Sequence, residues 1–121
     1  DLLTVTNETY DYTVLSGTLN LLNDLDKKDW KQYSYNLIKK MFAISRKGIA
    51  FNFLTSYNTF NQDDLMYFDP SEVFKYCIKN LSRFVIIDHG YPLYEATATV
   101  FKKDFLKSFY IGNAFDKYFV N

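Results

Sequence analysis

Three residues that follow the first predicted strand occupy a position that points to ligand binding. Ser16, Gly17 and Asn20 come after the run from Tyr10 to Leu15, whose Tyr, Val and Thr content predicts a buried strand. Open α/β sheets bind ligands beyond the carboxyl ends of their strands. In an ordinary turn, the side chains of Ser16 and Asn20 would instead satisfy backbone groups. Both interpretations stay open at this point.

Asn52 is the only strongly polar residue in the apolar run from Ile49 to Leu54. Burying its amide without partners would cost on the order of a few kcal/mol. We therefore expect it to be hydrogen-bonded, to a backbone neighbour in preference to a substrate.

The segment from Thr55 to Phe68 is long for a simple connection between neighbouring elements. Its Tyr57 and Asn58 could belong to a lid over a substrate, and a solvated connector is equally compatible. Asp63 and Asp64 are expected to face solvent, and no metal site is predicted.

His89 is the only histidine and the natural candidate for a general base, because its unperturbed pKa lies near neutrality. It falls in a tight turn, where a surface position is favoured. Cys77 lies on a predicted buried helix face, where a thiol usually packs as a small apolar group. No Ser-His-acid arrangement, paired cysteine motif or phosphate loop with its lysine occurs, so catalytic residues remain unassigned.

Two predicted helices alternate with the strands. Asp29 is expected to cap the first, which Gly48 would end, before Ile49 to Leu54 forms a strand covered on both faces. Asp69 should cap the second, with Glu72 reaching back toward the cap. The expected apolar faces are Trp30, Tyr33, Leu37, Ile38, Met41 and Phe42 in the first helix, and Val73, Phe74, Cys77, Ile78 and Leu81 in the second.

Two further strands, Arg83 to Ile87 and Leu93 to Lys102, are joined by a turn short enough to predict an antiparallel pair. The earlier strands are connected through helices and should be parallel. We expect residues 1–121 to form a single α/β domain, in which residues 103–121 make a short helix and an aromatic tail that packs back.

The composition excludes several classes of protein. Fourteen basic residues balance fourteen acidic ones, so the chain offers no net field to attract nucleic acid. No apolar run approaches the roughly 20 residues of a membrane span. A single cysteine and no recognisable signal peptide favour the cytoplasm. The opening Asp1-Leu2-Leu3 suggests a cut or processed start, preceding a polar connector over residues 4–9.

Several segments, in order, resemble the carboxyl-terminal half of class I S-adenosylmethionine-dependent methyltransferases, which are Rossmann-like. Residues 10–20 resemble the fourth strand and following loop of that family, and residues 48–54 resemble its fifth strand. Residues 81–87 and 91–101 resemble the closing antiparallel pair. The resemblance covers about residues 8–102 and implies a partial methyltransferase sheet.

The resemblance also implies what such an enzyme needs and this chain lacks. The family holds its cofactor mainly through a glycine-rich turn after the first strand and an acidic residue after the second. The four glycines of this chain are far apart. We therefore expect weak or absent binding of S-adenosylmethionine by the isolated chain. The sheet edge left unpaired would favour a homodimer.

Two functions remain in competition. The first is a fragment, inactive alone, of a methyltransferase acting on a small acceptor that the sequence does not identify. In that case the resemblance assigns Ser16, Gly17 and Asn20 to the cofactor, and Asn52, Tyr57 and His89 are candidates for substrate contacts. The second is a non-catalytic interaction or assembly domain. The enzyme activity of the isolated chain is therefore left undecided.

Overall fold

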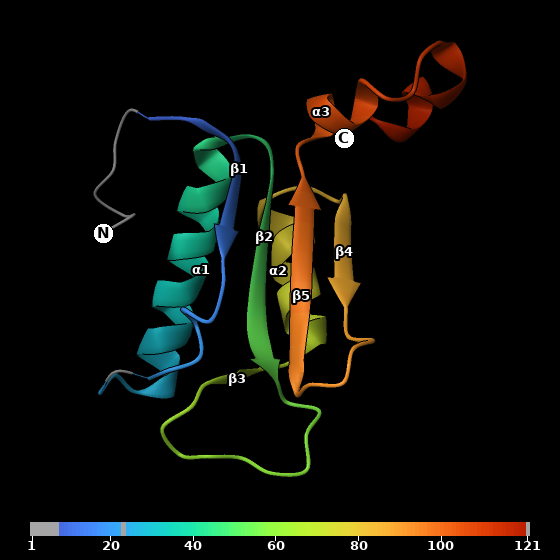
Figure 1. Cartoon of the computed structure of the whole chain (residues 1–121). Coiled ribbons are helices and arrows are strands. Elements are labelled where there is room, and N and C mark those ends of the chain that lie inside the picture. Colours follow the sequence, from blue (N-terminus) through green and yellow to red (C-terminus); the bar gives the residue numbers. More distant parts are fainter. Residues whose placement is uncertain (1–7, 23, 121) are drawn as a thin grey trace.

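The fold is an open, mixed α/β sheet, seen in a computed structural model that describes residues 8–22 and 24–120 (Figure 1). The expected start at Asp1 and most of the polar connector over residues 4–9 lie outside the described residues. The elements in chain order are β1 (Tyr10–Leu15), α1 (Lys27–Ala43), β2 (Ser45–Thr55), β3 (Tyr67–Phe68), α2 (Pro70–Asn80), β4 (Val85–Asp88), β5 (Glu95–Phe101), α3 (Lys103–Lys107) and the 3-10 helix η2 (Asn113–Tyr118).

The sheet order confirms the predicted topology. Its main path runs β1-β2-β5-β4, with the short β3 paired to the end of β2. β1 and β2 are parallel, and β5 lies antiparallel to both of its neighbours, β2 and β4. The last strand therefore inserts between β2 and β4 in the reverse direction, and the predicted antiparallel pairing of the last two strands is confirmed. β3 was not predicted, because two residues carry no periodicity.

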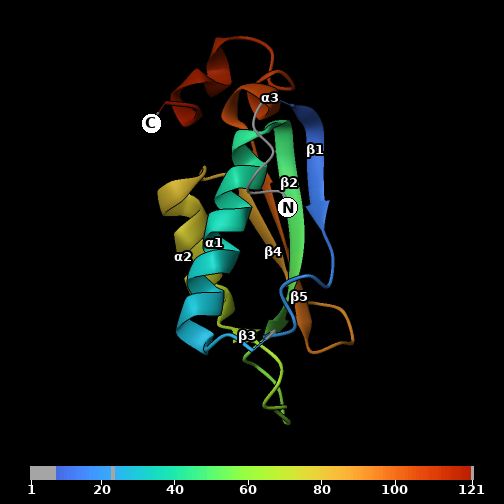
Figure 2. The same cartoon turned by 90° about the vertical axis from the view of Figure 1, so that its left-hand side faces the viewer.

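Both long helices cover the same face of the sheet, as the side view shows (Figure 2). Ile49, Phe51 and Phe53 of β2 are buried under them, whereas Ala50 and Asn52 on the other face are only partly buried. The prediction of a strand covered on both faces is therefore wrong within the described residues. A continuous apolar run does not tell whether a second layer is present.

The prediction of a buried first strand is also wrong. β1 lies at the edge of the sheet, so one side of its backbone has no partner among the described residues. Tyr10, Tyr12 and Val14 are exposed, and the register with β2 places Tyr12 and Val14 on the face that the helices leave open. Thr13 and Leu15 alternate with them and are partly buried. Aromatic and β-branched residues identified the strand but not its place in the sheet.

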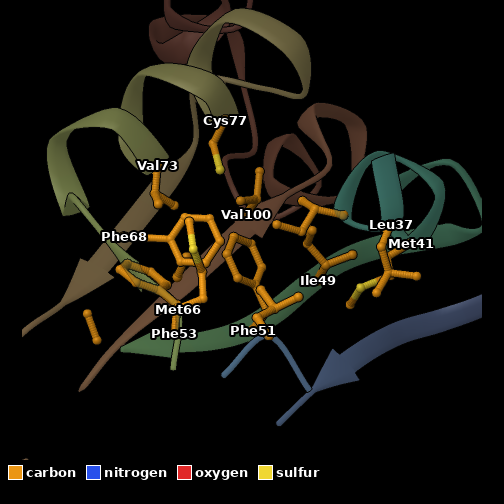
Figure 3. Packing of buried hydrophobic residues seen from close by; sticks show 14 of the residues in the cluster. Leu37, Met41, Ile49, Phe51, Phe53, Met66, Phe68, Val73, Cys77 and Val100 are labelled. Carbon is orange, nitrogen blue, oxygen red and sulfur yellow. The ribbon is translucent and has the colours of Figure 1, made fainter. Parts of the chain in front are cut away.

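One apolar core fills the space between the helices and the covered face (Figure 3). Phe51 and Phe53 occupy its centre, and both are at most 1% exposed. Cys77 belongs to this core as predicted, and burial raises the pKa of its thiol to about 12. The other labelled members come from both helices, β2, β5 and the segment around β3: Leu37, Met41, Ile49, Met66, Phe68, Val73 and Val100.

The first helix begins and ends earlier than predicted. Asp26 is its N-cap, and the Oδ1 atom of Asp26 accepts a hydrogen bond of 2.7 Å from the backbone N–H of Asp29. The helix ends at Ala43, with Ile44 as C-cap. Gly48 therefore does not stop the helix and lies inside β2 instead. A Cβ atom at position 48 would lie 2.7 Å from the carbonyl oxygen of Val100. The absence of a side chain at Gly48 therefore permits the close approach of β5 to β2.

The second helix begins as predicted but uses a narrower apolar face. The Oδ1 atom of Asp69 accepts from the backbone N–H of Ser71, and Pro70 occupies the first turn. Glu72 does not reach back to the cap, since its carboxylate pairs with Lys31 at 2.6 Å. Val73 and Cys77 are buried, while the predicted face residues Phe74 and Ile78 are exposed.

The carboxyl-terminal segment and β3 lie at opposite ends of the strands (Figure 1). It turns at Gly112, whose φ of +96° favours glycine. Phe119 is buried and its ring lies 5.2 Å from that of Phe84. The guanidinium of Arg83 donates to the carbonyl oxygen of Tyr118. These contacts join the segment to the loop before β4.

We predict that Gly48→Ala destabilises the chain by about 1–3 kcal/mol, because the new methyl group would force β2 and β5 apart. The free energy of unfolding, measured by urea denaturation, checks this. Gly90→Ala is the matched control, because its Cβ would meet only the Asp88 side chain at 3.5 Å. Equal stability of the two variants would show that the strands adjust without cost.

Candidate functional site

The loop after β1 is held in place by a buried leucine and a tryptophan. Leu19 is 1% exposed, and its carbonyl oxygen accepts a hydrogen bond of 2.9 Å from the Trp30 indole N–H. The backbone turns at Gly17, whose φ is +72°. Ser16, Gly17 and Asn20 are therefore positioned beyond the carboxyl end of β1 by contacts with the core.

Asn52 joins this loop to the neighbouring strand. Its Oδ1 atom accepts a hydrogen bond of 2.7 Å from the backbone N–H of Gly17, and its Nδ2 atom donates to Ser16 Oγ at 3.3 Å. The sequence-based expectation of a backbone partner for Asn52 is met by the Gly17 bond. Three of the predicted site residues are thus brought together, although Asn52 lies 35 positions from Gly17 and 36 positions from Ser16 in the chain.

Asn20 has an unused acceptor. Its backbone N–H donates to the Gly17 carbonyl at 3.4 Å, and its own carbonyl accepts from the Met66 N–H at 2.9 Å. The side-chain Oδ1 atom, in contrast, is buried and has no hydrogen-bond partner among the described residues. An unsatisfied buried acceptor costs about 1–3 kcal/mol, so a donor from a ligand or water would stabilise this position.

Tyr57 and His89 form a second group at the end of β2. The His89 Nε2 atom lies 2.9 Å from the Thr55 Oγ1 atom, and its ring meets that of Tyr57 edge to face at 5.9 Å. Thr55 also accepts from the Tyr57 backbone N–H and, through its carbonyl, from the Asn58 amide. His89 is exposed in the turn between β4 and β5, as predicted.

A tyrosine on the same turn faces the open side of the sheet. The Tyr91 hydroxyl donates to Glu95 Oε2 at 3.0 Å and lies 2.8 Å from Thr97 Oγ1. Burial raises the pKa of Tyr91, and the neighbouring Glu95 carboxylate adds to that increase. Thr97 pairs with Asn52 in the register of β2 and β5. Asn52 therefore connects the loop after β1 with the strand that carries this hydrogen-bond network.

Sequence reasoning missed Thr55 and Tyr91. It assigned Thr55 to the following loop, whereas Thr55 is the last residue of β2 and is fully buried. Tyr91 was recognised only as part of a turn. A polar residue at the end of an apolar run is a signal for the first. The role of Tyr91 depends on cross-strand register, which the sequence does not specify.

The geometry suits binding and orientation of a ligand. The described residues contain no cluster of three or more metal-ligating side chains, and Asp63 and Asp64 are exposed. His89 has a hydroxyl partner in Thr55, and no described carboxylate hydrogen-bonds its ring. The site therefore offers hydroxyl, amide and imidazole groups at the carboxyl ends of β1 and β2.

Comparison with known proteins supports the architecture. No protein-family model matches the chain. Over 95 residues it is 40% identical to "Putative methyltransferase Rv1506c" of Mycobacterium tuberculosis strain H37Rv, a match that covers 76% of this chain and 57% of that protein. The crystal structure of magnesium protoporphyrin IX methyltransferase from Synechocystis PCC 6803 with bound SAH superposes with a TM-score of 0.57. That superposition has 9% sequence identity and covers 84% of this chain and 48% of that one.

The chain has part of a methyltransferase fold. It spans about half the length of each of these two similar proteins. The observed order β1-β2-β5-β4, with β5 reversed, agrees with the resemblance to the carboxyl-terminal half of that fold. Among the described residues, no helix has both the length and the apolar character required to cross a bilayer.

We predict that Asn52→Ala releases the turn at Ser16 and Gly17, because the variant loses both side-chain hydrogen bonds. The expected loss of stability is about 1–2 kcal/mol. The rate of hydrogen exchange at the Gly17 amide should rise by at least the factor that corresponds to the loss in free energy of unfolding. Asn36→Ala on the exposed surface of α1 is the control, and unchanged Gly17 exchange in Asn52→Ala would contradict this role.

Proposed function

We propose that this chain is the carboxyl-terminal part of an S-adenosylmethionine-dependent methyltransferase that acts on a small-molecule acceptor. The observation that carries the proposal is the 40% identity over 95 residues to a protein named as a methyltransferase. The sheet order and the superposition on a methyltransferase with bound SAH support it. Methyl transfer to a good nucleophile needs orientation and a shaped pocket more than a dedicated acid or base.

The proposed cofactor contacts are Ser16, Gly17 and Asn20. They follow β1 at the edge where open α/β sheets bind ligands. The buried, unpartnered Oδ1 atom of Asn20 supports a ligand donor nearby. The cofactor half of the family, with its glycine-rich turn, would supply most of the remaining contacts. The isolated chain would therefore bind S-adenosylmethionine weakly or not at all and would be inactive.

Tyr57, His89 and Asn52 are the proposed substrate contacts. Tyr57 is 63% exposed beside His89, so its ring is accessible. The Asn52 amide uses one lone pair and one hydrogen on the loop after β1, which leaves a second of each for a ligand. The Tyr91 hydroxyl would orient polar groups of the acceptor, whereas the buried Thr55 hydroxyl would act by holding the His89 ring in place. The chemical identity of the acceptor atom is left open.

A non-catalytic assembly domain is the alternative function, and the uncovered face of the sheet favours it. Tyr12, Val14 and Ile86 are exposed, and the strand register places them on that face. A second protein chain could cover them instead of the missing half of the fold. Discovery of an initiator Met directly before Asp1 in the gene would favour this alternative.

We predict that the isolated chain shows no saturable binding of S-adenosylmethionine by isothermal titration calorimetry. A longer chain that also carries the glycine-rich cofactor half of the family fold should bind it. In that longer chain, Asn20→Ala should weaken binding about tenfold, through loss of one buried hydrogen bond. Asn36→Ala is the matched control.

Two results would contradict the proposal. Tight binding by the isolated chain would show that the missing half is not needed. Failure of the extended chain to bind would support the assembly domain.

We further propose that residues 1–121 form a single domain that pairs with a second copy through the free edge of β1. Unpaired N–H and C=O groups on an exposed edge are a template for a further strand. We also propose that the protein is located in the cytoplasm, because its one cysteine is buried and unpaired. Cell fractionation tests the location.

The dimer predicts a concentration-dependent increase in mass in sedimentation experiments. Val14→Lys on β1 should shift the protein to monomer, because a charged edge opposes pairing. Ile86→Lys on β4 is the matched control, since this residue is exposed on the same face at the opposite edge of the sheet. A monomer at all concentrations, or equal effects of both variants, would exclude the β1 edge as the interface.

A further inference from the structure

A cavity lies at the end of the sheet opposite the candidate site. It measures about 780 Å³ and opens between the carboxyl ends of α1 and α2, the loop before β4 and the carboxyl-terminal segment. In Figure 2 this region lies between the upper ends of the two helices and the segment after β5. Its volume falls within the range of small-molecule sites.

The lining is basic. Arg46, Arg83, Lys102 and Lys103 contribute cations, and Asp104 is the one lining carboxylate. Arg46 is already paired with Asp11, at 2.9 Å from Nε to Oδ1. Two positive charges therefore remain uncompensated by the described residues around the cavity.

The ends of the two helices reduce this charge without cancelling it. The carbonyl groups at the carboxyl end of a helix act as about half a negative charge. α1 and α2 each present such an end, and Lys40 and Lys79 lie in their last turns. The lining thus keeps a net positive charge of about one even before these two lysines are counted.

Lys102 is the most informative of the cations. Its ammonium group lies 4.1 Å from the centre of the Phe42 ring and forms no ion pair with any residue in the described ranges. Partial burial lowers its pKa, because desolvation disfavours the charged form. An anion beside this group would replace the lost hydration.

The remaining wall is apolar and suits a hydrophobic ligand body. The Arg83 guanidinium stacks over Phe84 at 4.4 Å, and the Lys102 ammonium lies over Phe42. The apolar lining residues are Phe42, Ile78, Leu81, Phe84, Phe119 and Val120.

We propose that this cavity binds a small organic anion, with its phosphate or carboxylate group at Lys102 and its apolar body against Phe42 and Phe84. Neither a bare anion nor a neutral apolar molecule would use both parts of the lining. The site is separate from the loop after β1, so its test is independent of the proposed methyltransferase function.

The test is a titration of the chain with each of four probes, in which binding is measured by calorimetry and by changes in amide chemical shifts. Phenyl phosphate and benzoate should bind and shift the amides of Lys102 and Phe84. Inorganic phosphate and benzyl alcohol, which each carry half of the chemistry, should bind at least about tenfold more weakly. The ratio of phenyl phosphate to benzoate affinity identifies which anionic group the site prefers.

Variants assign the binding to the cavity. Lys102→Met keeps the aliphatic stem and should weaken both organic anions about tenfold, whereas Lys102→Arg should retain binding. Lys39→Met, on the exposed surface of α1, is the matched control and should change nothing. Equal binding of benzyl alcohol and phenyl phosphate, unchanged affinity in Lys102→Met, or no binding by the unmodified chain would overturn the proposal.

Discussion

The close pairing of β2 with β5 is the contact on which the rest of the structure depends. β2 is the strand that also carries β1 and β3, and its register with β5 extends from Gly48 to Leu54. Gly48 allows the approach at one end of this pairing. Phe51 and Phe53 point from β2 into the core under both helices. A shift of one residue would turn these rings toward the open face.

The same register builds the candidate site. When Phe51 and Phe53 face the helices, Asn52 must face the other side of the sheet, because side chains alternate along a strand. There it reaches Ser16 and Gly17 on one side and pairs with Thr97 on the other. The position of this polar residue is thus a consequence of the burial of the phenylalanines on either side of it in the sequence.

The two faces of the sheet differ in how they are covered. Helices α1 and α2 bury one face, while exposed aromatic and β-branched side chains line β1 on the other. At the end of the sheet opposite the candidate site, the carboxyl-terminal segment forms part of the wall of the basic cavity. The two ends of the sheet therefore differ in chemistry. The candidate site has hydroxyl, amide and imidazole groups, and the cavity has ammonium and guanidinium groups beside aromatic rings.

The sequence alone determined the order and type of the main elements. Periodic apolar residues identified α1 and α2, and a turn too short for a crossover identified β4 and β5 as antiparallel. It also identified the resemblance to part of a methyltransferase fold. These features are local or are repeated over many residues, so they can be predicted from the sequence alone.

Only the tertiary structure decided which faces are covered and which polar groups meet. Val14 and Ile49 both lie in strong strand sequences, yet one is exposed at an edge and the other is buried beneath a helix. Gly48 reads as a helix stop in sequence, and its true role depends on a strand some 50 residues away. The bond from Gly17 to Asn52, the pairing of His89 with Thr55 and the cluster around Lys102 all join distant segments. Such contacts depend on the packing of the whole sheet, because neither burial nor register is a property of a short segment.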